Sequence, residues 1–231
     1  MTLMSLGFHY ESFIHADPFI EGIIGVILFL YIFAIVFGTK YTYKIFRAHN
    51  LPHNVAAYYN RKIIHIFGGG VATLLFPIFF TGVTIPLILV SIIAFAVYLP
   101  HKMGRLLSWF QVEENMYEVN FAIAWGAAIG ISWVFFGDPI YGVIPAAFIS
   151  FGDAITGIVR NAVFKRRTKH WLGNLAMIMV CAPIGYYYAG IAGLVAAFVS
   201  SVVEHFEFNP IDDNVLITLS ALIVLAIFRG L

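Results

Sequence analysis

The sequence SFGDAITGIVRNAVFKRRTKHWLGN occupies residues Ser150–Asn174 and connects two apolar runs of the chain. Asp153 lies within the first run, and Arg160 follows it two helical turns later on the same face. The densest basic cluster of the chain comes next, with Lys165, Arg166, Arg167 and Lys169. A carboxylate at membrane depth costs about 2.5–3.5 kcal/mol on insertion scales, so it needs a partner, water or a metal.

Two interpretations of this stretch are open. In the first, Asp153 and Arg160 form a buried ion pair beside an ordinary positively charged loop. In the second, the carboxylate and the basic cluster hold a metal and a polyphosphate together at a membrane surface.

The composition indicates an integral membrane protein. Of the 231 residues, 61% are hydrophobic and only 11% are charged, whereas soluble domains carry roughly 25% charged residues. The net charge of +1 provides no broad basic field, so we expect no nucleic-acid partner. The single cysteine, Cys181, lies in an apolar run, which excludes a disulfide framework and a cysteine metal site.

Apolar runs set the expected architecture, because a membrane-spanning helix needs about 20 apolar residues. Eight runs approach this length, at 19–39, 63–80, 83–100, 118–136, 139–160, 171–188, 190–206 and 213–229. We therefore predict an all-α, polytopic membrane protein with about eight transmembrane helices. The whole chain, 1–231, forms one transmembrane domain, with an N-terminal span and loop over 1–59 and a catalytic region over 60–231. The turn between the sixth and seventh runs is tight, so some helices are expected to be tilted or broken.

Basic residues predict the orientation, since they favour cytoplasmic loops. With eight alternating spans, the basic loops at 40–62, 102–105 and 160–169 fall on one side and only Arg229 falls on the other. We predict a multi-pass protein of the cell membrane with both termini outside. Most acids share the cytoplasmic side: Glu113, Glu114, Glu118, Asp153, Glu204, Glu207, Asp212 and Asp213. Acids contribute little to topology, so their gathering beside the bases is typical of a site for metal and phosphate.

Three further polar segments are candidates for that site, each with a structural alternative. Arg61 and His65 are four residues apart and share a helical face; they would contact phosphate or a carboxylate, or be a snorkelling base and a core histidine. Glu114 and Glu118 have the same spacing; they would bind Mg²⁺ or take a proton from an alcohol, or form a charged helix start.

The last cytoplasmic turn runs from Glu204 to Asp212-Asp213-Asn214. Asp212 could cap the final helix. Two adjacent aspartates, an asparagine and an upstream glutamate exceed what a cap requires, and hard oxygen ligands of this kind suit Mg²⁺. The chain contains no GxxxxGK[ST], GxGxxG or HExxH motif, so any nucleotide chemistry must use another architecture.

Several of these segments occur together in a recognisable order: RKIIH at 61–65, glutamates at 114–118, FGDA at 151–154, the basic run through Lys169 with Gly173-Asn174, and Glu204 followed by Asp212-Asp213-Asn214. This order resembles the CTP-dependent polyprenol kinase family, which includes dolichol kinase, phytol kinase and a CTP-using diacylglycerol kinase. The likeness runs from about residue 60 to the C-terminus.

The resemblance implies transfer of the γ-phosphoryl group of CTP to an isoprenoid alcohol in the bilayer, with Mg²⁺, giving CDP and a lipid phosphate. The predicted metal ligands are Asp153, Glu204, Asp212, Asp213 and Asn214. The predicted contacts to the CTP phosphates are Arg61, Lys62, Arg160, Lys165, Arg167, Lys169, Gly173 and Asn174. Asp153 is the central catalytic carboxylate, and Glu118 or Asp213 would accept the alcohol proton.

The chain departs from the family pattern in two places. Arg160 lacks the glycines that usually surround it, and the segment Lys169–Asn174 lacks the family's glutamate. Two other functions fit the same residues: a cytidylyltransferase that makes a CDP-lipid, and a small membrane transporter with charged residues within its spans. The sequence does not specify the alcohol, the preference for CTP over other nucleotides or the oligomeric state.

Overall fold

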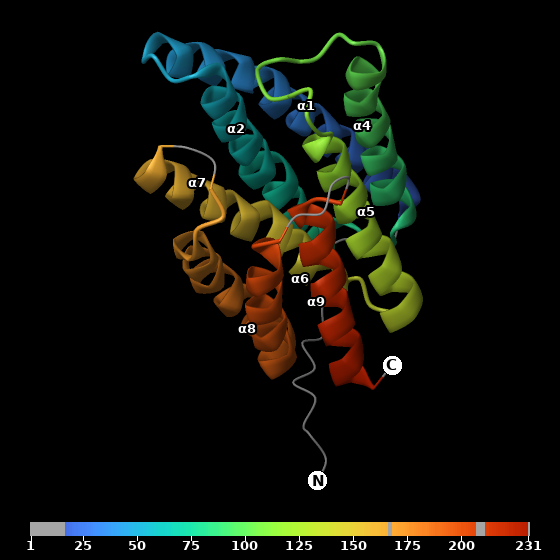
Figure 1. Ribbon diagram of the computed structural model, residues 1–231. Coiled ribbons are helices and arrows are strands. Elements are labelled where there is room, and N and C mark those ends of the chain that lie inside the picture. Colours follow the sequence, from blue (N-terminus) through green and yellow to red (C-terminus); the bar gives the residue numbers. More distant parts are fainter. Residues whose placement is uncertain (1–16, 166–167, 207–210, 231) are drawn as a thin grey trace.

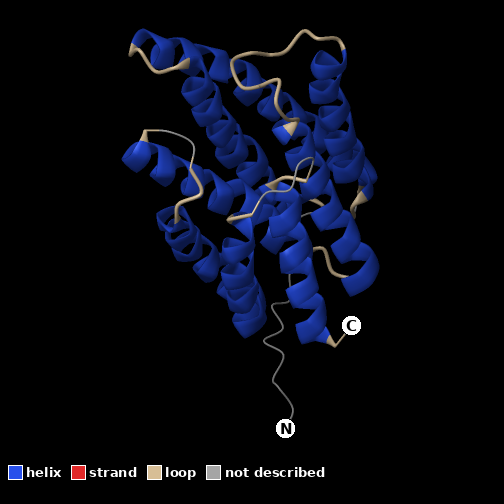
Figure 2. Ribbon diagram, in the orientation of Figure 1, coloured by secondary structure: helices blue, strands red, loops and turns tan. Residues whose placement is uncertain are grey.

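The structure is a computed structural model that describes residues 17–165, 168–206 and 211–230. Within these ranges the chain forms helices joined by loops, the longest of which connects α4 to α5, and it contains no strand (Figure 2). The all-α prediction is therefore confirmed. The helical elements are α1 (Pro18–Ala48), α2 (His53–Ile64), η1 (His65–Gly70), α3 (Val71–Phe79), α4 (Thr84–Lys102), α5 (Tyr117–Phe136), α6 (Ile140–Ala147), η2 (Phe148–Gly152), α7 (Asp153–Phe164), α8 (Trp171–Glu204) and α9 (Asp213–Arg229) (Figure 1).

In the described part of the chain, six helical runs are long and apolar enough to cross a bilayer: Pro18–Ala48, His53–Phe79, Thr84–Lys102, Tyr117–Phe136, Ile140–Phe164 and Trp171–Glu204. Large apolar side chains also cover their outer faces; Val134 of α5, for example, is 74% exposed. A surface this apolar needs lipid rather than water around it. The chain is accordingly a helical membrane protein, while the count of eight spans and the sidedness of the loops stay predictions.

Helix α8 is broken in its middle, where the sequence predicted a tight turn. Gly190 has φ 56° and ψ −132°, a conformation that side chains rarely adopt. The two halves of α8 then run back along each other: Ser201 donates its hydroxyl to the carbonyl of Asn174 at 2.7 Å, and Gly185 packs directly against the backbone of Gly193. This hairpin brings Glu204, at the end of α8, beside the start of the same element (Figure 1).

The run Ile140–Phe164 lies at the centre of the bundle. In its most apolar stretch of 18 residues, 78% of the residues are buried. It contains one π-helical turn, η2, which packs against the other π-helical turn, η1. Gly70 of η1 faces the ring of Phe151 so closely that a Cβ atom there would overlap it, and a Cβ atom on Gly69 would overlap the ring of Phe121 and lie only 3.0 Å from Oγ of Ser150. Single π-helical turns inside α-helices occur frequently at functional sites.

Candidate functional site

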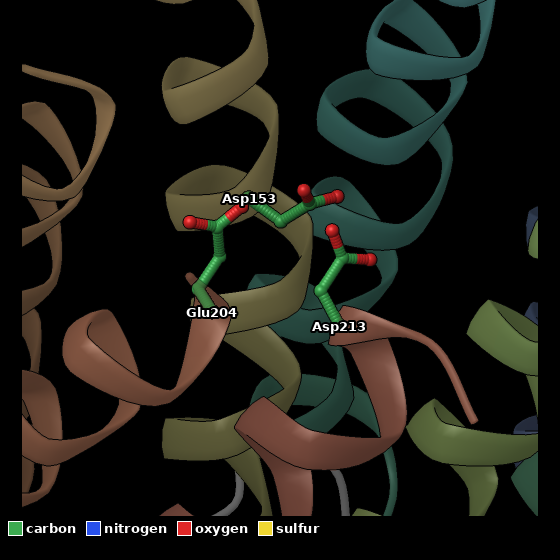
Figure 3. Close-up of side chains that lie close together, drawn as sticks. All are labelled: Asp153, Glu204 and Asp213. Atoms are coloured by element: carbon green, nitrogen blue, oxygen red, sulfur yellow. The ribbon is translucent and has the colours of Figure 1, made fainter. Parts of the chain in front are cut away.

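Three carboxylates from separate elements converge at one end of the bundle. Asp153 begins α7, Glu204 ends α8 and Asp213 begins α9, and one oxygen atom from each lies within 4.8 Å of the other two. The close-up shows the three side chains pointing toward one another (Figure 3). Asp153 and Glu204 are almost fully buried, whereas the Asp213 side chain is 13% exposed. The structure thus brings together three of the predicted metal ligands.

Asp153 is held by one residue of α2, Lys62, and by the first residue of η1, His65. The Lys62 ammonium donates to both carboxylate oxygens, at 2.8 and 2.7 Å. His65 Nδ1 lies 3.2 Å from Oδ2 of the same carboxylate. Both members of the Lys62–Asp153 pair are buried. Lys62 was predicted to contact phosphate. In the structure its ammonium is bound to Asp153.

Arg160 pairs with Glu204 and not with Asp153. Its guanidinium donates to both Glu204 oxygens, at 2.7 and 2.8 Å, and Nε donates to the carbonyl of His170 at 2.8 Å. The buried Asp153–Arg160 pair, one of the two interpretations of the sequence, is therefore wrong. Seven residues along a helix correspond to a rise of about 10.5 Å, so Arg160 reaches a partner on another helix instead.

Gly173 and Asn174 position the side chain of Arg160. The side-chain oxygen Oδ1 of Asn174 accepts from Nη2 of Arg160 at 2.7 Å. A Cβ atom on Gly173 would overlap the Arg160 side chain, so glycine is what allows the guanidinium to pass. These two residues were predicted to contact CTP phosphates, and the structure shows them positioning a basic side chain.

Lys169 bridges the remaining two carboxylates. Its ammonium lies 3.1 Å from Oε1 of Glu204 and 2.9 Å from Oδ2 of Asp213. Burial favours the neutral amine, but the carboxylates of Asp213 and Glu204 outweigh it and raise the pKa of Lys169 above its usual range. Lys169 therefore stays charged at any physiological pH.

A pocket of about 430 Å³, partly open to solvent, lies beside these groups and is called the polar pocket below. Its walls include four cations, Arg61, Lys62, Arg160 and Lys169. Among the described residues, three carboxylates, those of Asp153, Glu204 and Asp213, form ion pairs with these cations, so the charges favour an anionic ligand.

Three buried polar atoms of residues that line the polar pocket have no hydrogen-bond partner within the described part of the chain. They are Nη1 of Arg61, Nε2 of His65 and Oδ1 of Asn214. A buried polar atom without a partner costs about 1–3 kcal/mol, so these atoms indicate the place of a ligand. The Arg61 guanidinium is further held over the ring of Tyr117, 4.4 Å from its centroid.

Asp212 and Asn214 have a structural role that the sequence left open. Asp212 is the N-cap of α9. Its Oδ1 accepts from the backbone N–H of Val215 at 3.3 Å, and its Oδ2 accepts from the side-chain amide of Asn214 at 3.0 Å. Burial, together with the neighbouring Asp213 charge, raises the pKa of Asp212 to about 7. Its oxygens are not among the three that converge, and metal binding by Asp212 and Asn214 stays a prediction.

Glu118 lies away from the acidic group. One of its oxygens is bound by His101 and by Gln111, whose amide donates at 2.7 Å; the other, Oε2, is buried without a partner among the described residues. Glu118 lines a different, apolar cavity. Lys165 is exposed at the end of α7, and Arg167 lies outside the described residues.

Sequence reasoning missed Tyr58. This residue lines the polar pocket, and the Lys62 ammonium lies 4.9 Å from the centroid of its ring. Tyr58, Lys62 and His65 recur at the four- and three-residue spacings of one helical face, which was the available signal.

Comparisons with protein-family models, with curated proteins and with solved structures gave no match to this chain. The resemblance to CTP-dependent polyprenol kinases stays a prediction.

Proposed function

We propose that this protein is a lipid kinase that transfers the γ-phosphoryl group of CTP to a polyprenol such as dolichol, giving polyprenyl phosphate and CDP. The observation that carries the proposal is the meeting of three carboxylates and four cations, from separate helices, in one pocket of an apolar helical bundle. Phosphoryl transfer depends mostly on positioning and on charge stabilisation, and these are the properties of this pocket. The choice of CTP and of an isoprenoid acceptor rests on the ordered motifs alone.

Mg²⁺ fits the carboxylate group. Oxygens bound to one Mg²⁺ at about 2.1 Å lie up to about 4.2 Å apart, and the three carboxylate oxygens approach that spacing already. Asp153, Glu204 and Asp213 would hold the ion, which when bound neutralises charge on the phosphate oxygens. Lys62 and Lys169, which now neutralise these carboxylates, would then be released toward the phosphates.

The basic residues divide into two kinds. The guanidinium of Arg160 donates to Glu204, Asn174 and the His170 carbonyl. Arg160 would therefore hold Glu204, a proposed metal ligand, in place. Arg61 keeps Nη1 without a hydrogen-bond partner in the described chain, and it is the guanidinium that would grip a phosphate oxygen.

The transfer balances as follows. The lipid hydroxyl oxygen forms a bond to the γ-phosphorus while the bond from that phosphorus to the β–γ bridging oxygen breaks, and CDP leaves. The hydroxyl proton passes to a carboxylate, Glu118 or Asp213: Asp213 lines the polar pocket, and Oε2 of Glu118 is buried without a partner among the described residues. We further propose that the chain crosses the cell membrane eight times, with this pocket on the cytoplasmic side where CTP is found.

The test uses purified protein in nanodiscs with Mg²⁺, polyprenol and CTP labelled at the γ-phosphate. We expect labelled polyprenyl phosphate. Absence of labelled lipid with every isoprenoid alcohol tried would reject the proposal. A cytidylyltransferase is separated by label at the α-phosphate: it would enter a CDP-lipid made from a lipid phosphate, together with release of pyrophosphate.

A further inference from the structure

A second, apolar cavity of about 940 Å³ lies between α1, the run from α2 to α3, α4 and α5, and is called the apolar cavity below. Hydrophobic side chains form nearly all of its wall, among them Ile32, Ala72, Val90, Ile93, Ala122 and Trp125. Within the part of the chain that the structure describes, the charged or titratable residues that line it are Arg61, His65 and Glu118. A cavity with this lining accepts hydrocarbon.

The apolar cavity and the polar pocket meet at two side chains. Arg61 and His65 line both. His65 is fixed between them, because Nδ1 faces Asp153 at 3.2 Å and its ring stacks on Phe121 with centroids 3.9 Å apart. A molecule that filled the apolar cavity would therefore present its polar end to the carboxylate group.

The polar end of the apolar cavity has unsatisfied hydrogen-bonding groups. Nη1 of Arg61, Nε2 of His65 and Oε2 of Glu118 are all buried and lack partners among the described residues. The Arg61 atom is a donor and the Glu118 oxygen is an acceptor. A hydroxyl group both donates and accepts one hydrogen bond, so one alcohol satisfies groups of both kinds.

The length of the apolar cavity along α4 matches the thickness of the hydrocarbon layer of one leaflet. Its wall on α4 extends from Pro86 to Val97; at a rise of about 1.5 Å per residue, these two residues lie about 16 Å apart along the helix. The hydrocarbon core of a bilayer is about 30 Å thick. A chain lying in the cavity would thus span about half of the membrane while its head remained at the polar pocket.

We infer that the apolar cavity is the binding site of the lipid-alcohol acceptor, with its hydrocarbon chain between α1, α4 and α5 and its hydroxyl held by Arg61, His65 and Glu118. The inference rests on the proposed function for the identity of the acceptor, but the binding itself can be measured without any phosphoryl transfer.

The experiment is photo-crosslinking of the full chain in nanodiscs, without nucleotide, by a long-chain isoprenoid alcohol that carries a diazirine on its hydrocarbon. Peptides are then mapped by mass spectrometry. We expect labelling of the cavity-facing residues of α1, α4 and α5, and its suppression by excess unlabelled polyprenol but not by excess phosphatidylcholine. Labelling spread evenly over the lipid-exposed faces, or equal suppression by phosphatidylcholine, would overturn the inference.

Two pairs of variants sharpen the result. Ile93→Trp and Ala122→Phe fill the apolar cavity, while Ile92→Trp and Ile123→Phe place the same aromatic side chains at neighbouring residues that are about half exposed on the outside, 48% and 56%. We expect the filled variants to lose about tenfold of the cavity labelling, equivalent to 1.4 kcal/mol of binding, and the controls to lose none. Unchanged labelling in a folded filled variant would contradict the inference, and the map of the unaltered protein decides alone if neither filled variant folds.

This design separates the two proposals. Specific labelling of the apolar cavity without any labelled product from CTP would retain the acceptor site and reject the kinase. Product formation with labelling elsewhere would retain the kinase and reject this site.

Discussion

Asp153→Asn removes the charge that balances the buried ammonium of Lys62. The two groups are 2.7 Å apart, with side chains only 3% and 7% exposed. Breaking a buried pair by neutralising one member costs about 3–5 kcal/mol. For a chain of this size, about 2–4 °C per kcal/mol converts that loss into a Tm lower by about 6–20 °C. Lys62→Met should cost a similar amount, because it leaves the Asp153 carboxylate unpaired.

The double variant Asp153→Asn/Lys62→Met distinguishes stability from chemistry. Neither charge remains buried in it, so we expect most of the stability to return, with a coupling energy of about 0.5–3 kcal/mol. Phosphoryl transfer should not return, since a metal ligand and a basic group are both missing; a loss of about 10²–10³-fold is typical for one electrostatic group.

The assay combines thermal unfolding of detergent-purified protein with transfer of label from CTP. Lys44→Met, on an exposed part of α1, serves as the control that removes a lysine charge without burial. If the destabilisations of the two single variants simply add in the double variant, the buried pair does not exist as described. If the double variant regains activity together with stability, Asp153 has only a structural role.

Three further outcomes are expected. Gly173→Ala should push the Arg160 side chain from Glu204, costing about 1–3 kcal/mol, whereas Gly22→Ala, in open space, should not lower the Tm. Addition of Mg²⁺ should raise the Tm of the unaltered protein and not that of Glu204→Gln; equal shifts would remove Glu204 from the metal site. The pKa of Asp212 rises from 3.8 to about 7 on folding, so its folded state binds the proton more tightly and stability is lost as pH increases from about 4 to 7. The Asp212→Asn variant should therefore lose less Tm than the unaltered protein as the pH rises across that range. The same pH dependence of Tm in both proteins would contradict this role of Asp212.

Composition and local spacing were sufficient for the class of fold. An apolar chain with few charges forms helices in a membrane because its backbone groups must bond internally there. The break at Gly190 and the capping of α9 by Asp212 depend only on neighbouring residues, and both could be anticipated. The gathering of Asp153, Glu204 and Asp213 was also expected, from an alternation of eight spans that stays a prediction.

The partner of each charge required the tertiary structure. Spacing along one helix suggested Asp153 with Arg160, yet Lys62 reaches Asp153 from 91 residues away and Arg160 reaches Glu204 across 44. The apolar cavity, and the two side chains that join it to the polar pocket, likewise depend on four separate helical segments. A sequence determines which residues share a face of one helix, because the helical repeat is constant; which faces meet depends on how all the helices pack together.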